Sequence, residues 1–330
     1  MIIMKEEVLA RLEKPKIGSM RESYGETLAR LGAENKKIVV VGADTTGSIK
    51  TSIFGQKFPE RFFNVGIAEQ NMISVAAGLA MADKVAFAST YAVFAPGKCV
   101  DQMRNAIAYP QIDVKLVASH AGISVGPDGA SHQELEDIAT MRAIPQMKVM
   151  VPSDSISTSK IIEIASKTHG PFYVRISRPN IPTIYSQKEA DAMTVGGSTV
   201  FAEGTDATIF ACGLLVYESL VAAKKLAVEN GLSVGVVDLY SIKPMDSSTI
   251  IKNARSTGHV VTAEEHNIMG GMGGAVSEFL SEECPTFMKR VGTMDTFGES
   301  GEDKDLMVKY GLTANNIANK VLAVRSLSRR

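Results

Sequence analysis

The amino-acid sequence predicts an α/β protein made of two doubly wound domains, of which the second is the smaller. Short apolar runs alternate with helix-like segments along most of the chain, as in parallel sheets whose strands are joined by helices. The alternation stops once, between residues 178 and 205, and then resumes. The strand-like runs are apolar on both faces, which a sheet covered by helices on both sides requires. A length of 330 residues suits about two such domains.

The first domain contains five apolar, β-rich runs separated by helical segments. We expect strands over residues 37–44, 84–90, 113–120, 148–154 and 171–177. We expect helices over residues 20–31, 68–83, 97–109, 133–144 and 155–168, the last of them capped by the Ser and Asp before it. Ligand sites of such sheets form outside the carboxyl ends of the strands.

The second domain follows a stretch with prolines, polar residues and a Gly-Gly pair but no sustained period, which is typical of a linker. Beyond it we expect strands over residues 206–213, 232–246, 259–266 and 287–293, and helices over residues 216–231, 273–283 and 312–330. The predicted organisation is an N-terminal extension, a larger domain, a linker and a smaller domain, over residues 1–17, 18–182, 183–205 and 206–330.

Composition excludes several classes of protein. Lys and Arg number 35 against 36 Asp and Glu, so no whole-chain field attracts nucleic acid or an anionic membrane. The three cysteines are scattered and form neither a zinc motif nor a disulfide framework. No apolar run reaches the roughly 18–20 residues of a membrane span, and the first residues carry charges where a signal peptide needs its apolar core. We therefore expect a cytoplasmic protein without a metal site of its own.

Glu69 is the first unusual residue. It follows "NVGIA" and stands at the head of the apolar, alanine-rich run "MISVAAGLAMA". Desolvating a carboxylate costs free energy, which is a reason to suspect function. A glutamate favoured by the dipole at a helix N-terminus is the structural alternative, and both can hold at once.

A second candidate site is the stretch "SHAGISVGPDGASHQELED", residues 119–137. It holds His120, Asp128 and His132 in a loop rich in Gly and Ser that leaves the carboxyl end of a predicted strand. Such loops build ligand sites in parallel sheets. A long surface loop capped by Ser131 is an equally good interpretation of these residues alone.

Four other features are weak when taken singly. "GADTTGS", residues 42–48, is compatible with a phosphate or cofactor loop but consists of ordinary turn residues. Arg21 on a predicted helix and Arg178 after a predicted strand are by default solvated. Tyr91 and Phe94 form an aromatic pair of the kind more often found in a core, although their place at a strand's carboxyl end favours a site.

Taken in order, these motifs resemble those of the C-terminal half of transketolase, which consists of a thiamine diphosphate pyrimidine-binding domain and a C-terminal domain. The resemblance runs from about Arg21 to the last helix. It is carried by "GAD", "NVGIAEQNM", "SHAGISVGPDGASHQ", "ISRPNIP", "EEHNIMGGMGGAV" and "FGESG…YGLT". Several spaced motifs in one order form a specific signal, which a single motif would not.

The resemblance implies a role for Glu69. In the family, the matching glutamate hydrogen-bonds the N1′ nitrogen of the cofactor's aminopyrimidine and favours the imino tautomer, whose N4′ takes the proton from the thiazolium C2. The resulting ylid is the nucleophile. A poorly solvated carboxyl suits a shared proton. Phe94 matches the aromatic residue that stacks on the pyrimidine, Tyr91 its neighbour, and Asp44 a residue of the cofactor region.

The remaining candidates match substrate residues. His132 matches a histidine near the reacting carbons, a candidate proton relay, and Asp128 an aspartate that binds a substrate hydroxyl. The family's residues that bind the sugar phosphate are matched by Arg21, Ser48, His120 and Arg178. Guanidinium groups suit this task because their fork holds a phosphate through two hydrogen bonds. The chain departs from the family after Phe94, where "APG" replaces a frequent third aromatic residue.

The family's G-D-G motif, which with a later Asn binds a divalent metal and the diphosphate, is absent from the sequence. We therefore expect the small subunit of a split transketolase that forms a homodimer. Its thiamine diphosphate would be shared with an N-terminal-section partner subunit, and that partner would hold Mg²⁺ or Ca²⁺. The enzyme would move a two-carbon ketol unit between sugar phosphates, as in the pentose phosphate pathway.

Other functions stay open at this point. They are a 1-deoxyxylulose-5-phosphate synthase-like protein, the β subunit of a 2-oxoacid dehydrogenase, a transketolase for an unusual sugar, and a non-catalytic module that kept the fold. The phosphate-binding set counts against the dehydrogenase, which has no sugar phosphate to hold. Intact Glu69, Phe94 and the phosphate set count against the non-catalytic module.

Overall fold

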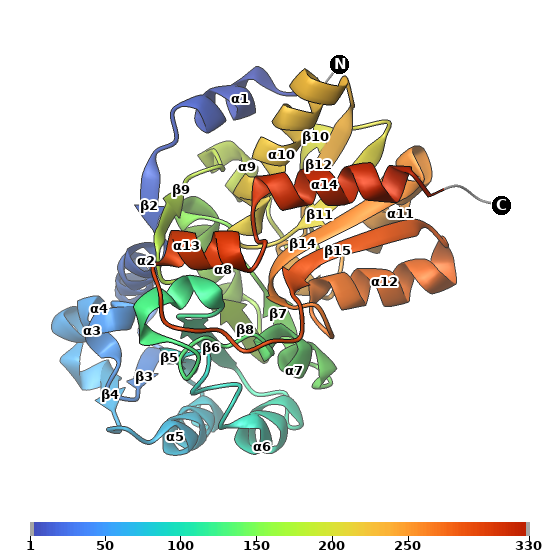
Figure 1. Ribbon diagram of the computed structural model, residues 1–330. Coiled ribbons are helices and arrows are strands. Elements are labelled where there is room, and N and C mark those ends of the chain that lie inside the picture. Colours follow the sequence, from blue (N-terminus) through green and yellow to red (C-terminus); the bar gives the residue numbers. More distant parts are fainter. Residues whose placement is uncertain (1–2, 328–330) are drawn as a thin grey trace.

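The computed structural model describes residues 3–327, which form two α/β domains, each built around one large sheet (Figure 1). A third, two-stranded sheet pairs β2 (Ile17–Ser19) with β9 (Asn180–Pro182). The first sheet has seven strands in the order β13-β7-β8-β6-β5-β3-β4. Its strands are β3 (Ile38–Gly42), β4 (Phe62–Asn64), β5 (Val85–Tyr91), β6 (Val114–Ser119), β7 (Lys148–Met150), β8 (Phe172–Arg175) and β13 (Ser241–Lys243). All pairs are parallel except β13 with β7. The predicted α/β class with parallel sheets is confirmed.

Helices connect these strands and cover the sheet. Those of the first domain are α2 (Met20–Glu34), α3 (Thr46–Ile49), α4 (Ser52–Lys57), α5 (Glu69–Met81), α6 (Val100–Gln102), α7 (Asp137–Ala143) and α8 (Ser155–Lys167). Short turns of other helix types are η1 (Pro59–Arg61), η2 (Met103–Ala108) and η3 (Ile123–Asp128). Asp154 caps α8 by accepting a hydrogen bond from the Ser157 N–H, as the sequence predicts.

The second sheet has six strands in the order β1-β10-β12-β11-β14-β15. They are β1 (Ile3–Met4), β10 (Thr199–Glu203), β12 (Val234–Asp238), β11 (Ala207–Ala211), β14 (His259–Asn267) and β15 (Phe287–Thr293). The four strands from β12 to β15 are parallel, and β1 and β10 add an antiparallel edge. Its helices are α10 (Leu215–Asn230), α11 (Ser247–Thr257), α12 (Met272–Glu283), α13 (Asp303–Lys309) and α14 (Ala314–Arg325).

The segments expected as extension and linker contain regular structure. The extension carries α1 (Glu6–Glu13) and β2 (Ile17–Ser19), and the linker carries α9 (Gln187–Asp191) after β9 (Asn180–Pro182). Residues 183–205, expected as a linker without a sustained period, also contain the strand β10, which pairs with β12. The extension is docked, since Arg11 forms an ion pair of 2.8 Å with Glu189 and β1 pairs with β10. Residues 1–2 of the expected extension and 328–330 of the expected last helix lie outside the described residues.

Two predicted helices differ from the structure. The segment 133–144 becomes helical only at Asp137, because Gln133 and Glu134 bond to the preceding loop instead. Gln133 Nε2 donates to the carbonyls of Ile123 and Gly126, and Glu134 lies in a β-bridge with Ala121. The segment 97–109 forms α6 followed by the wider turn η2.

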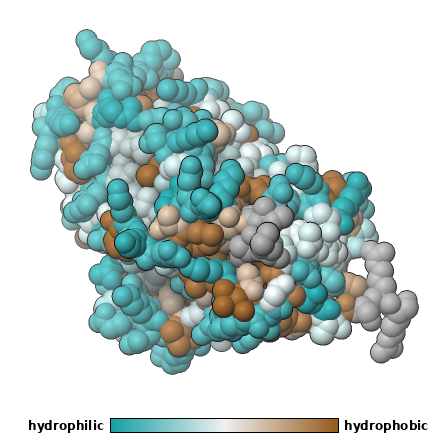
Figure 2. Space-filling model, turned by 90° about the horizontal axis from the view of Figure 1, so that it is seen from above, coloured by the Kyte–Doolittle hydropathy of each residue, from teal (hydrophilic) through white to brown (hydrophobic). Residues whose placement is uncertain are grey.

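The second domain lies against the loops at the carboxyl ends of the first sheet. The segment between β15 and α13 runs back across the first domain (Figure 1), where the Glu299 carbonyl accepts a hydrogen bond of 2.9 Å from Gln133 Nε2. On the face shown in Figure 2, hydrophobic residues form small groups between hydrophilic ones. Among residues 3–327, none of the helices combines the length and apolar character needed to cross a membrane.

Candidate active site

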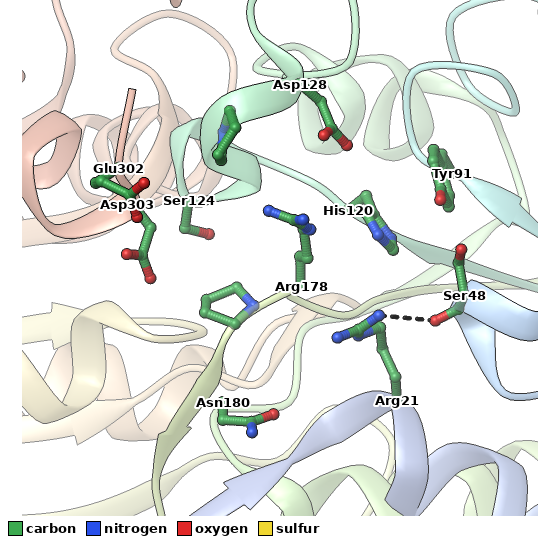
Figure 3. A pocket seen from close by; sticks show the side chains of 12 residues that line it. Arg21, Ser48, Tyr91, His120, Ser124, Asp128, Arg178, Asn180, Glu302 and Asp303 are labelled. Carbon is green, nitrogen blue, oxygen red and sulfur yellow. Dashed lines mark hydrogen bonds between the residues drawn. The ribbon is translucent and has the colours of Figure 1, made fainter. Parts of the chain in front are cut away.

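Five of the six residues that the resemblance assigns to the substrate lie around one cavity of about 690 Å³ (Figure 3), and the sixth, His132, is not among its lining residues. They come from separate elements, since α2 carries Arg21, α3 carries Ser48, η3 carries Asp128, and His120 and Arg178 follow strands β6 and β8. Tyr91, the last residue of β5, lines the same cavity. The cavity therefore lies at the carboxyl ends of β3, β5, β6 and β8, where the parallel sheet predicts a ligand site.

Two guanidinium groups line this cavity, that of Arg21 from α2 and that of Arg178 from the segment after β8 (Figure 3). Arg21 Nη1 donates to the Ser48 carbonyl at 2.8 Å, and Arg178 Nη1 donates to the Val125 carbonyl at 2.5 Å. Burial and then the charge of Arg178 lower the pKa of Arg21 from its usual value. Two like charges held together in a cavity are repulsive unless an anion lies between them, so the arrangement suits an anionic group.

His120 is buried beside the two arginines. Its ring stacks on Tyr91 with centroids 3.8 Å apart, and its Nδ1 lies 2.7 Å from Ser119 Oγ. Burial, followed by the positive charges of Arg21 and Arg178, lowers the pKa of His120 to about 3. The imidazole is thus neutral near pH 7 and offers a neutral hydrogen bond to a ligand.

The lowered pKa of His120 predicts a pH effect on stability. Between its usual pKa of 6.5 and about 3, only the unfolded chain protonates this histidine. The unfolded state then binds more protons, so the free energy of unfolding falls as pH falls through this window. His120→Asn should therefore lose less stability between about pH 7 and pH 5 than the wild type, as measured by urea denaturation. His169→Asn, which changes an exposed histidine, serves as control, and parallel losses in His120→Asn and wild type would contradict the assignment.

Of the residues assigned to the cofactor, Tyr91 lines this cavity and links it to Phe94. Phe94 stacks on Tyr91 with centroids 5.7 Å apart, and the ring of His132 stands edge-on to Phe94 at 5.4 Å. Glu69 is the first residue of α5 and is 4% exposed. Asp44 follows β3, and its backbone N–H donates to Asn64 Oδ1 at 2.9 Å.

These residues fit an aminopyrimidine. In the described part of the chain, the Glu69 carboxylate has one hydrogen-bond donor, Lys98 Nζ, at 2.8 Å from Oε2. The Phe94 ring, which Lys98 Nζ approaches to 5.2 Å from its centroid, offers an apolar face. A buried carboxyl beside an aromatic face matches the polar edge and the flat ring of the pyrimidine. Among the described residues no group of three or more His, Cys, Asp or Glu side chains is placed to hold a metal ion.

The second domain contributes to the site in two ways that the sequence did not reveal. Glu302 and Asp303, at the start of α13, line the cavity opposite Arg178 (Figure 3). Glu265 on β14 accepts a hydrogen bond of 2.6 Å from the Ser124 N–H and so supports the loop that carries Asp128. The motif "FGESG", just before Glu302, was the available signal for the acidic residues at the cavity. Nothing in the spacing of the sequence shows that Glu265 on β14 faces the loop that carries Ser124.

A buried ion pair supports the same loop. Arg175 Nε donates to Asp137 at 2.7 Å, and its Nη2 donates to the Glu265 carbonyl at 2.7 Å. The nearby Glu134 has a pKa raised to about 8 by burial and by the charges of Asp137 and Glu136. This network joins β8, α7 and β14, so the loop carrying His120 and His132 rests on both domains.

Comparison with known proteins assigns these two domains to a class. The transketolase pyrimidine-binding domain matches residues 18–183, and the transketolase C-terminal domain matches residues 196–317. The pairing is that of thiamine diphosphate enzymes of the transketolase type. The chain belongs to the transketolase family.

Individual relatives agree with this assignment. The chain is 46% identical, over 92% of its length and 95% of the relative's, to a protein of Methanocaldococcus jannaschii named "Putative transketolase C-terminal section". It is 38% identical to a 6-deoxy-6-sulfo-D-fructose transketolase subunit of Clostridium sp., over 90% of this chain and 92% of that one. A solved structure described as "Split gene transketolase, inactive beta4 tetramer" has 47% identity and a TM-score of 0.88, and the match covers 94% of this chain and 100% of that one.

Proposed function

We propose that this chain is the smaller, C-terminal subunit of a split transketolase that transfers a two-carbon ketol unit between sugar phosphates. The observation that carries the proposal is the cavity that brings Arg21, Arg178, Ser48 and His120 together with Tyr91, on which Phe94 stacks. Glu69 is linked to the Phe94 ring through Lys98. An anion site next to a pyrimidine site is what a ketol transfer between sugar phosphates needs. A 2-oxoacid dehydrogenase subunit has no use for the anion site.

Each side chain has a task in this proposal. When bound, thiamine diphosphate supplies the nucleophilic carbon and the electron sink. Glu69 holds a proton against N1′ of the pyrimidine, and Phe94 orients the ring by stacking. Arg21 and Arg178 bind the terminal phosphate and so fix the distance from that phosphate to the reacting carbons. His132 lies beside Phe94, where it can move a proton to or from a substrate hydroxyl.

We propose that an N-terminal-section partner completes the site. The sequence lacks the G-D-G motif of the diphosphate site. Ile67, two residues before the buried Glu69, is an apolar side chain that is 81% exposed, and we propose that the partner subunit covers it. The partner would hold Mg²⁺ or Ca²⁺ and the diphosphate. We propose an assembly in which a homodimer of this chain binds two partner subunits.

A transketolase for an unusual sugar is the second candidate. Glu302 and Asp303 line the same cavity as the two arginines, and their charges oppose binding of a doubly charged phosphate. A terminal group of lower charge would be opposed less. The relative named as a 6-deoxy-6-sulfo-D-fructose transketolase subunit supports this second candidate.

Reconstitution tests the proposal. This chain and an N-terminal-section subunit from the same genome are purified separately and mixed with thiamine diphosphate and Mg²⁺. We expect ketol transfer from xylulose 5-phosphate to ribose 5-phosphate only from the mixture, because each chain holds half of the cofactor site. Light scattering should give the mass of two copies of each chain. Transfer by this chain alone, or no transfer to any sugar acceptor by the mixture, would disprove the split-enzyme proposal.

A further inference from the structure

Lys98 makes two contacts that the mechanism does not use. Its Nζ lies 2.8 Å from Glu69 Oε2 and 5.2 Å from the centroid of the Phe94 ring. Its side chain is 51% exposed, whereas that of Glu69 is 4% exposed. The ammonium group therefore reaches from solvent to a buried carboxylate across an aromatic ring, combining an ion pair with a cation–π contact.

Glu69 and Phe94 are also the two residues that fit the aminopyrimidine. The ring would stack on Phe94, and its N1′ would meet the Glu69 carboxyl. Lys98 supplies a hydrogen-bond donor to the same carboxylate and a positive charge to the same ring. In the sequence, Lys98 directly follows the segment "APG", which stands where the family often has a third aromatic residue.

We infer that Lys98 holds the pyrimidine site in the subunit without cofactor and must leave Glu69 before the aminopyrimidine can bind in full. The inference rests on the proposed function, because it takes the site next to the cavity to be a pyrimidine site. Lys98 is thus a positioning residue that acts through Glu69. It keeps the carboxylate neutralised and in place while the site is open, and it lowers the affinity for the cofactor.

The surroundings of Lys98 allow its side chain to leave Glu69 without a movement of the backbone. Its backbone is anchored, because Gln70 Nε2 donates to the Lys98 carbonyl at 3.2 Å. The preceding Gly97 makes a tight turn, in which a Cβ atom would clash with the Val93 carbonyl oxygen. The side chain is half exposed and can swing into solvent while the backbone stays fixed, so release needs only rotamer changes.

Removal of this side chain should tighten cofactor binding. In the complex of this chain with its partner, Lys98→Ala is expected to lower the dissociation constant of thiamine diphosphate by about three- to thirtyfold, the equivalent of one charged contact that no longer has to be broken. Simple electrostatics predicts the opposite sign, because the variant loses a positive charge near a negatively charged cofactor. The direction of the change therefore separates the two explanations.

The experiment is a calorimetric titration of thiamine diphosphate into the assembled complex in the presence of Mg²⁺. Lys57→Ala, which removes the charge of an exposed lysine at the end of α4, is the matched control and should bind like wild type. A second pair of variants, Glu69→Gln with and without Lys98→Ala, removes the carboxylate that Lys98 holds. In that background the Lys98 substitution should change affinity less than about twofold, because the two residues no longer interact.

The outcomes separate this inference from the proposed function. Tighter binding by Lys98→Ala that disappears in the Gln background supports the competition. Equal or weaker binding by Lys98→Ala, with normal binding by wild type, overturns the role of Lys98 and leaves the proposed function standing. Absence of thiamine diphosphate binding in the wild-type complex would overturn both.

Discussion

Glu69→Gln is expected to lower kcat of the reconstituted enzyme by about 10²–10⁴-fold, the usual loss when a positioned proton-transfer partner is removed. Gln has the same shape as Glu, so the start of α5 should keep its packing, and the half-exposed Lys98 can turn to solvent when its partner loses charge. The amide cannot share a proton with N1′. Deprotonation at C2 of the bound cofactor should therefore slow together with kcat.

Hydrogen–deuterium exchange at cofactor C2, followed in the assembled enzyme, is the readout that a structural role would not change. Glu60→Gln, which removes a carboxylate next to Arg61 on the surface, is the control and should exchange like wild type. If C2 of the cofactor exchanges in Glu69→Gln as fast as in wild type, Glu69 serves only to start the helix.

Arg178→Ala should lower kcat/KM for phosphorylated donors by about tenfold to hundredfold, which corresponds to one charged hydrogen bond to phosphate. A non-phosphorylated donor such as erythrulose should be almost unaffected. His120→Ala should act in the same direction but less strongly, because the imidazole is neutral and gives up an uncharged hydrogen bond. Parallel assays of xylulose 5-phosphate and erythrulose measure the difference.

Arg178 also donates to the Val125 carbonyl, so its loss could disturb the loop that carries Asp128. A disturbed loop would affect both donors, whereas a lost phosphate contact affects one. Arg255→Ala, on α11 in the second domain, controls for general loss of an exposed arginine and should leave both donors unchanged. Equal losses of both donors in Arg178→Ala would refute the phosphate assignment.

The parallel strands could be predicted because their signal is local. The run "IVVV" in β3 is buried at each of its four positions, so its apolar character shows on every residue. Glu69 could be singled out for a similar reason, since a carboxylate at the head of an apolar helix stands out in the sequence alone. The order of the motifs then linked Arg21 to Arg178, which are 157 positions apart in the sequence, and no spacing argument could do so.

Other features depend on partners that the sequence does not show. β10 is a strand because β12 and β1 lie on either side of it, and its own residues follow a Gly-Gly pair that favours a turn. Residues 133–136 have good helix formers, yet Gln133 bonds to the loop before it and delays the helix. Lys98 pairs with Glu69 across 29 residues, and Asp303 reaches the cavity from another domain.

The central claim is that one site of this chain holds the pyrimidine of the cofactor at Glu69 and the phosphate of the sugar between Arg21 and Arg178. A crystal structure of the complex with thiamine diphosphate and ribose 5-phosphate tests it most directly, because an acceptor without a donor cannot turn over. We expect N1′ within hydrogen-bonding distance of the Glu69 carboxyl, the phosphate in contact with both guanidinium groups, and Lys98 turned away from Glu69. A phosphate bound elsewhere, or a pyrimidine that does not meet Glu69, would contradict the account.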